Sequence, residues 1–167
     1  MSGTLPAAAK AGVAAVTAVL CGMVLVGCGD NGRPGLDDDN DLGTVGTARG
    51  EEGVRDAARA YLDAWSSGNP TIACGLTTAR KARIFGMSAG NGNCPDAFDN
   101  VRGRMSEDAR TTYQDTQIAE VKMIGGADGT TARVTLTRKL EGPVNGKDNL
   151  LFEHIGGRWQ TEGYPKE

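Results

Sequence analysis

The side chains with the most distinctive chemistry in this 167-residue sequence are its four cysteines, Cys21, Cys28, Cys74 and Cys94. A thiol can be acylated, can join a second thiol in a disulfide, or can bind a metal ion when further ligands stand nearby. His154 is the single histidine, and no paired carboxylates stand at metal-ligand spacing. No phosphate-binding loop or nucleophile elbow occurs either. The sequence therefore predicts no metal and no cofactor, and it leaves acylation and disulfide formation as the chemistry of the thiols.

Cys28 follows an uncharged apolar run, Ala11–Gly27, which itself follows a short leader with one positive side chain, Lys10. The run has 17 residues, fewer than the roughly 20 that cross a bilayer as a helix. A positive leader before a short apolar core is typical of a secretion signal. An ordinary signal cleaved after Gly29 and an uncleaved helix are the two alternatives.

The end of this segment, Leu25-Val26-Gly27-Cys28, resembles the lipobox of bacterial lipoprotein signal peptides. The resemblance implies that residues 1–27 are removed and that Cys28 begins the mature chain and carries a diacylglyceryl group. One acyl chain binds a membrane only marginally, at about 0.8 kcal/mol per buried methylene, so two chains, of palmitate type, make the attachment effectively permanent. The expected location is the extracytoplasmic face of the cell membrane.

Residues 28–50 carry the lipidated cysteine and are otherwise predicted to be a flexible acidic tether. They are rich in Gly and Asp and have almost no bulky apolar side chains, so they cannot bury enough surface to fold. Asp37, Asp39 and Asp41 alternate as in an EF-hand calcium loop. That loop needs Gly at its sixth position and Glu at its twelfth, where this chain has Leu42 and Ala48, so a solvated spacer is the preferred interpretation.

Cys74 and Cys94 remain after the signal is removed and Cys28 is acylated. An even pair of cysteines in an oxidising compartment predicts a disulfide. In the loop-entropy account, a bridge of this spacing contributes roughly 3 kcal/mol of stability. Two buried free thiols are the alternative.

Apolar residues at helical spacing predict three helices in the first half of a domain over 51–167. The clearest helix covers 51–67, and Gly68 is placed to end it. A second begins at Asn69-Pro70 and fades near 80–83. A third begins at Cys94-Pro95 and fades near Asp108. The stripe of the first helix consists of Val54, Ala57, Ala58, Tyr61, Leu62 and Trp65.

After Arg110 the apolar period is nearer two, which predicts β-strands. The expected strands lie within 112–124, 131–140, 150–155 and 158–164, and Gly156-Gly157 is expected to form a hairpin turn. Three helices followed by an antiparallel meander predict an α+β domain in which the helices pack on one face of a curved sheet of about four strands.

Two stretches of this domain resemble the NTF2-like (cystatin-like cone) superfamily. They are the long first helix over Val54–Pro70, which ends in Gly68-Asn69, and the closing hairpin Glu153–Gln160. The resemblance covers roughly 51–164. The paired cysteines around the second and third helices are similar to those of secreted actinobacterial lipoproteins of that superfamily.

The resemblance implies a pocket in the cone, for which Tyr61 and Trp65 are the candidate residues. In the ketosteroid isomerases and polyketide cyclases of the superfamily, a Tyr on the first helix donates a hydrogen bond to an oxyanion. Tyr61 stands at the matching place, seven residues before Gly68. These enzymes also need a carboxylate base after the second helix, and residues 83–88 contain no acid. Packing in the core is therefore the preferred role of Tyr61.

A net charge of −3 argues against a nucleic-acid partner. The preferred function is a non-catalytic lipoprotein module, anchored to the membrane through Cys28, that binds a small apolar ligand or another envelope protein. The alternative is an enzyme of the isomerase or cyclase type. A third interpretation is an interaction protein that forms a homodimer through the sheet, as many members of this fold do.

Overall fold

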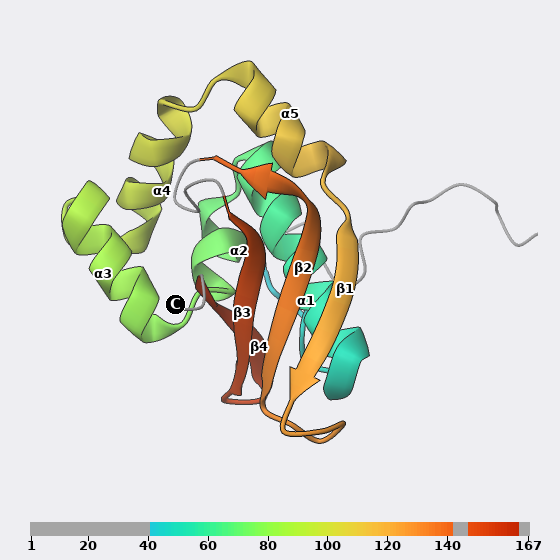
Figure 1. The fold of residues 1–167 in the computed structure, drawn as a ribbon. Coiled ribbons are helices and arrows are strands. Elements are labelled where there is room, and N and C mark those ends of the chain that lie inside the picture. The colour runs from blue at the N-terminus through green and yellow to red at the C-terminus, as the bar shows by residue number, and fades with distance from the viewer. Residues whose placement is uncertain (1–40, 142–146, 164–167) are drawn as a thin grey trace, which may run out of the picture. The chain divides into compact units, whose positions relative to one another are not determined.

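The described part of the chain folds into five helices followed by a four-stranded antiparallel sheet (Figure 1). The structure is a computed structural model that describes residues 41–141 and 147–163, all within one compact unit. The elements are α1 Gly50–Ser67, α2 Pro70–Gly75, α3 Ala79–Ala89, α4 Cys94–Gly103, α5 Glu107–Asp115, β1 Ile118–Ile124, β2 Thr131–Leu140, β3 Lys147–Ile155 and β4 Arg158–Gly163. The predicted α+β class and four-stranded antiparallel sheet are confirmed.

The predicted number of three helices is wrong, because two capping residues were overlooked. Thr78 begins a separate helix, α3, by accepting a hydrogen bond from the backbone N–H of Lys81. Ser106 begins α5 by accepting one from Ala109, and α5 covers 112–115, which the sequence assigned to a strand. Ser and Thr are favoured at such positions because their oxygens satisfy N–H groups that have no partner within the helix.

The predicted signal segment 1–27, Cys28 and the first part of the tether lie outside the described residues. Among the residues that are described, no helix is long and apolar enough to cross a membrane.

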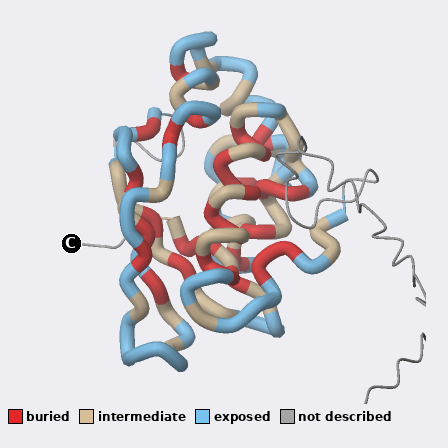
Figure 2. The backbone as a smooth tube through the Cα atoms, turned by 90° about the vertical axis from the view of Figure 1, so that its right-hand side faces the viewer, coloured by how far each residue is buried: buried red, intermediate tan, exposed pale blue. Residues whose placement is uncertain are grey.

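One face of the sheet packs against α1, and the core lies between them. The strands follow one another as β1-β2-β3-β4. In Figure 2 the buried segments of α1 and of the strands face each other. The fully buried side chains of the sheet are Ala132, Val134, Leu140, Leu150, Phe152 and Trp159. The alternation expected for 131–140 is confirmed, with Arg133, Thr137 and Lys139 on the exposed side.

Residues 42–49 pack against this core, although the sequence assigned them to the tether. Val45 is fully buried. The Arg158 guanidinium donates to the carbonyl oxygens of Leu42, Gly43 and Val45 at 3.2, 2.9 and 2.7 Å. The packed domain therefore begins by Leu42, because a buried valine and three partly buried hydrogen bonds to Arg158 hold a segment whose composition is typical of a flexible tether.

α4 is tied to the end of α1 by one arginine. Arg102 donates from Nε to the Trp65 carbonyl at 3.2 Å and from Nη2 to the Ser66 carbonyl at 3.0 Å. These are carbonyls of the last turn of α1, which have no partner within the helix and which favour a nearby cation. These two hydrogen bonds hold α4 against the C-terminal end of α1.

Candidate functional site

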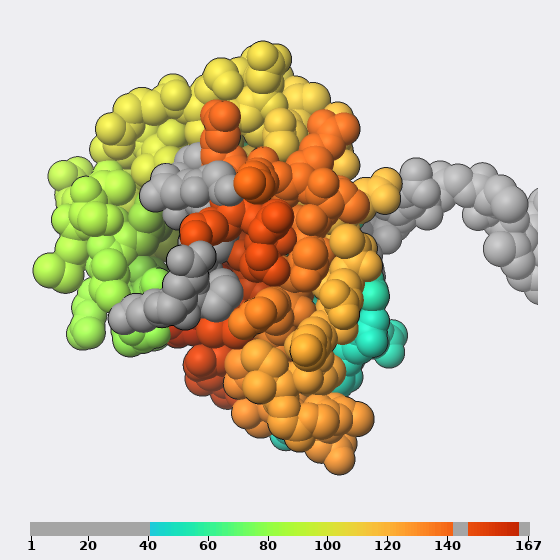
Figure 3. All heavy atoms as spheres, in the orientation of Figure 1, coloured from blue at the N-terminus to red at the C-terminus, as the bar shows by residue number. Residues whose placement is uncertain are grey.

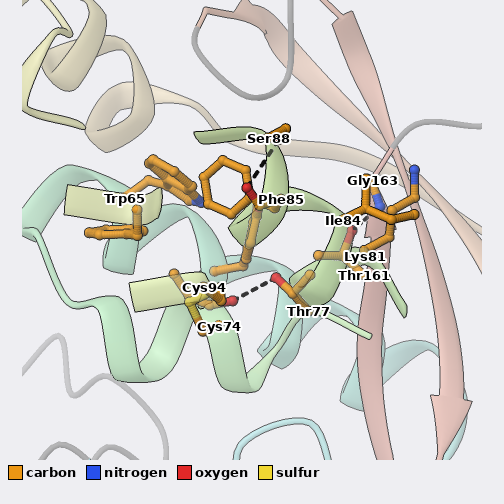
Figure 4. Close-up of a pocket in the computed structure, with 13 residues that line it drawn as sticks. Trp65, Cys74, Thr77, Lys81, Ile84, Phe85, Ser88, Cys94, Thr161 and Gly163 are labelled. Carbon is orange, nitrogen blue, oxygen red and sulfur yellow. Dashed lines mark hydrogen bonds between the residues drawn. A yellow bond between two sulfur atoms is a disulfide. The ribbon is translucent and has the colours of Figure 1, made fainter. Parts of the chain in front are cut away.

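A pocket of about 200 Å³ lies between the first four helices and β4 (Figure 4). Both sequence candidates, Tyr61 and Trp65, line it. They are joined by residues from elements far apart in the chain. The described residues of the lining are Tyr61, Trp65, Ala73, Cys74, Thr77, Lys81, Ile84, Phe85, Ser88, Cys94, Phe98, Thr161 and Gly163.

Aromatic rings form one wall of the pocket around Trp65. The Trp65 ring centroid lies 4.2 Å from that of Phe98, and it makes edge contacts with Phe85 at 6.2 Å and Tyr61 at 6.4 Å. Offset and edge arrangements of this kind are favourable and rigid. The wall therefore offers a preformed apolar surface.

The polar atoms of Tyr61 and Trp65 are sealed within this wall. Tyr61 is 5% and Trp65 2% exposed. Burial raises the pKa of the Tyr61 phenol to about 12, and the neighbouring Trp65 side chain opposes the shift only in part. The Trp65 Nε1 still has no acceptor with hydrogen-bond geometry in the described part of the chain. Tyr61 therefore stays a neutral phenol at physiological pH, and the Trp65 N–H is a buried donor without a well-formed hydrogen bond.

Cys74 and Cys94 form a disulfide, with an S–S distance of 2.01 Å and Cα atoms 5.9 Å apart. The bridge joins α2 to the first residue of α4, and both cysteines line the pocket (Figure 4). A covalent link at this place holds the two helices that carry Ala73 and Phe98. It thus sets the width of the pocket.

α3 closes the pocket from outside and packs chiefly against α4. Only Gly86 of this helix is buried, while Ile84 is 50% and Met87 73% exposed. Sequence reasoning missed this wall because it merged α3 with α2. The Thr78 cap followed by Ile84 and Phe85 was the signal that could have revealed it.

The aliphatic hydroxyl groups of the lining donate hydrogen bonds to backbone carbonyl oxygens of the domain. Thr77 donates to the Ala73 carbonyl at 2.7 Å, Ser88 to the Phe85 carbonyl at 3.0 Å, and Thr161 to the Leu151 carbonyl at 3.1 Å. Each hydroxyl proton is therefore already committed. Apart from the buried Tyr61 and Trp65, the remaining polar side chain of the described lining is Lys81, whose ammonium forms no ion pair with another described residue.

Comparison with family models, curated proteins and solved structures finds no match to this chain. The site must therefore be interpreted from its own geometry.

The ionisable side chains of the described lining are those of Tyr61 and Lys81. Within the described lining there is no carboxylate and no histidine, the groups that most often move protons in an active site. Over residues 41–141 and 147–163, no three His, Cys, Asp or Glu side chains are placed to hold a metal ion. His154 packs its ring edge-on against Trp159, 5.1 Å between centroids, and is not part of the pocket.

Proposed function

We propose that this protein is a lipoprotein anchored at Cys28 on the extracytoplasmic face of the membrane, and that its domain is a non-catalytic module for a small apolar ligand. One observation carries the binding function: the pocket between the helices and β4, with its preformed aromatic wall. A concave, largely apolar site with few polar groups is the usual form of a small-molecule site. The length of chain before the domain suits a tether to the lipid.

We also propose that the domain is a variant of the NTF2-like cone. The support is the order of its parts, a long first helix followed by shorter helices and a four-stranded antiparallel meander. The five helices depart from the three expected. The isomerase or cyclase alternative draws on Tyr61, which lines the pocket, but it needs a carboxylate that the described lining does not supply.

Association through the sheet is a separate proposal for a homodimer or an envelope partner. The face of the sheet away from α1 is uncovered over much of β1 and β2 (Figure 3). Its exposed side chains include Arg133, Thr137 and Lys139, so it is polar. A polar face offers little apolar surface for a stable partner to bury, whereas the pocket offers an apolar wall to a ligand. Binding in the pocket is therefore the preferred proposal.

The binding function predicts that decan-1-ol, a neutral apolar probe, binds one site per chain. We expect Ala73→Leu to weaken this binding at least about tenfold, because the added side chain fills the pocket at a position 2% exposed. The measurement is a titration of tryptophan emission with the full chain in phosphatidylcholine nanodiscs, corrected with empty nanodiscs.

The matched control for this titration is Ala119→Leu, the same change at an exposed position of β1 outside the lining. A melting curve checks that each variant folds. Absence of saturable binding by the unaltered chain, or equal affinity in Ala73→Leu, contradicts the proposal.

The location has its own test. Cys28→Ala removes the sulfur that would carry the lipid, so we expect the variant to lose labelling by a palmitate analogue and to leave the membrane fraction or remain unprocessed. Cys21→Ala, a change within the predicted signal, is the control and is expected to be labelled normally. Undiminished labelling of Cys28→Ala would overturn the lipoprotein proposal.

A further inference from the structure

The pocket has an unbalanced positive charge at one end. Lys81 is the one charged residue in its described lining. Its side chain is half-buried, and no ion pair joins it to another described residue. A cation beside an apolar cavity favours a ligand that brings a negative charge, because the attraction is screened less there than in open solvent.

The carboxylate of Glu162, the residue before Gly163 in β4, is already paired. Glu162 is 6% exposed, accepts a hydrogen bond from the Thr78 hydroxyl at 2.5 Å and forms an ion pair with Arg80. Arg80 and Lys81 are successive helical residues, about 100° apart around the axis of α3. Arg80 therefore balances the buried acid, and Lys81 keeps its charge for the pocket.

Lys81 reaches across the opening to β4. A Cβ placed on Gly163 would lie 3.9 Å from Lys81 Nζ, so the glycine leaves the strand backbone open beside the ammonium. In Figure 4, Lys81, Gly163 and Thr161 lie at one end of the pocket and Trp65 at the other, with Phe85 between them. The pocket thus has a cationic end and an aromatic end.

We infer that the ligand of this pocket is a single-chain amphiphile with one negative charge, a carboxylate that pairs with Lys81 while its apolar chain lies against the aromatic wall of Trp65, Phe85 and Phe98. The inference rests on the proposed binding function and specifies its ligand. One ammonium balances one charge. A phosphate dianion would bring a second negative charge that no further cation of the described lining balances, so a carboxylate is favoured over a phosphate monoester.

The test compares three probes of equal chain length, decan-1-ol, decanoate and decyl phosphate, at pH 8 with the full chain in phosphatidylcholine nanodiscs. We expect decanoate to bind about tenfold more tightly than decan-1-ol, the size of a charge-assisted hydrogen bond, and more tightly than decyl phosphate. Lys81→Gln is expected to remove the preference for decanoate over decan-1-ol, because it removes the charge that pairs with the carboxylate. Lys81→Arg is expected to keep most of the preference.

Lys122→Gln is the matched control, since it removes the same charge from an exposed position of β1. It is expected to bind all three probes as the unaltered chain does. A preference for decanoate that survives in Lys81→Gln, equal binding of decanoate and decan-1-ol, or tighter binding of decyl phosphate overturns the inference. If decan-1-ol binds but decanoate is not preferred, only the charge assignment fails. If none of the probes binds, the proposed function fails as well.

Discussion

Replacing Gly53 with alanine is expected to destabilise the domain by about 2–3 kcal/mol, the usual cost of forcing an extra methyl group into a filled site. Gly53 lies in α1, where alanine normally stabilises a helix relative to glycine. Here a Cβ would lie 1.8 Å from the Ala48 carbonyl oxygen and 2.9 Å from Trp159 Cδ1. The segment 42–49 would have to move away from α1.

That movement would disturb several contacts together. The Trp159 indole donates to the Ala48 carbonyl at 3.0 Å, and the Asp56 carboxylate accepts from the Gly46 N–H at 2.7 Å. The Trp159 backbone N–H donates to the Gly46 carbonyl at 2.8 Å, so the segment also covers the edge of β4. The substitution therefore tests whether 42–49 belongs to the domain or to the tether.

Gly103→Ala is the matched control, because Gly103 also lies in a helix but has nothing within 4 Å of a built Cβ. We expect this variant to be unchanged or more stable by up to about 1 kcal/mol. The free energy of unfolding in urea gives both values. If Gly53→Ala proves as mild as Gly103→Ala, residues 42–49 do not pack as described.

The parts of the fold that the sequence predicted well are those governed by local pattern. The alternation of 131–140 gave β2 at its observed bounds, and Gly156-Gly157 forms the expected turn with φ angles of 61° and 86°. α1 was recognised because a long amphipathic stripe and a terminal glycine agree. Each of these signals involves residues close together in the chain.

The caps of α3 and α5 are local signals that were overlooked, whereas two other missed features depend on partners distant in the chain. Val45 looks like an isolated apolar residue in a polar stretch until Arg158, 113 residues later, binds its carbonyl. The contact of Thr78 with β4 is likewise distant, because the Thr78 hydroxyl donates a hydrogen bond to the carboxylate of Glu162, 84 residues later. The spacing of apolar residues along the chain does not predict contacts between residues so far apart.

The pocket also combines residues that local pattern predicts with residues that only the tertiary structure brings together. Tyr61 and Trp65 could be proposed from the first helix and from the resemblance, but the approach of Lys81 to β4 could not, because it requires the placement of α3. That placement follows from the isolated pairing of Thr77 with Thr161, where the Thr161 N–H donates to the Leu76 carbonyl at 2.6 Å and the Thr78 N–H to the Thr161 carbonyl at 3.1 Å. The end of the pocket that carries Lys81 therefore depends on tertiary contacts.

Loss of the disulfide is expected to lower the free energy of unfolding by about as much as Gly53→Ala does. It is also expected to weaken ligand binding, because both cysteines line the pocket. The double variant Cys74→Ala/Cys94→Ala removes a link across 20 residues of sequence, for which the loop-entropy account gives roughly 3 kcal/mol of lost stability. α3 lies within the loop that the bridge closes, and it packs chiefly against α4. We therefore expect a lower urea midpoint and weaker binding of decan-1-ol in the same variant.

Treatment with a reductant distinguishes the effect of losing the S–S bond from the effect of replacing the two cysteine side chains. Dithiothreitol is expected to lower the midpoint of the unaltered chain toward that of the double variant and to leave the double variant unchanged, because only the former has a bond to break. Alkylation and mass measurement confirm that Cys74 and Cys94 have become free thiols. If both are alkylated while the midpoint and the binding of decan-1-ol stay as before, the bridge is not what holds α2 and α4 at the width of the pocket.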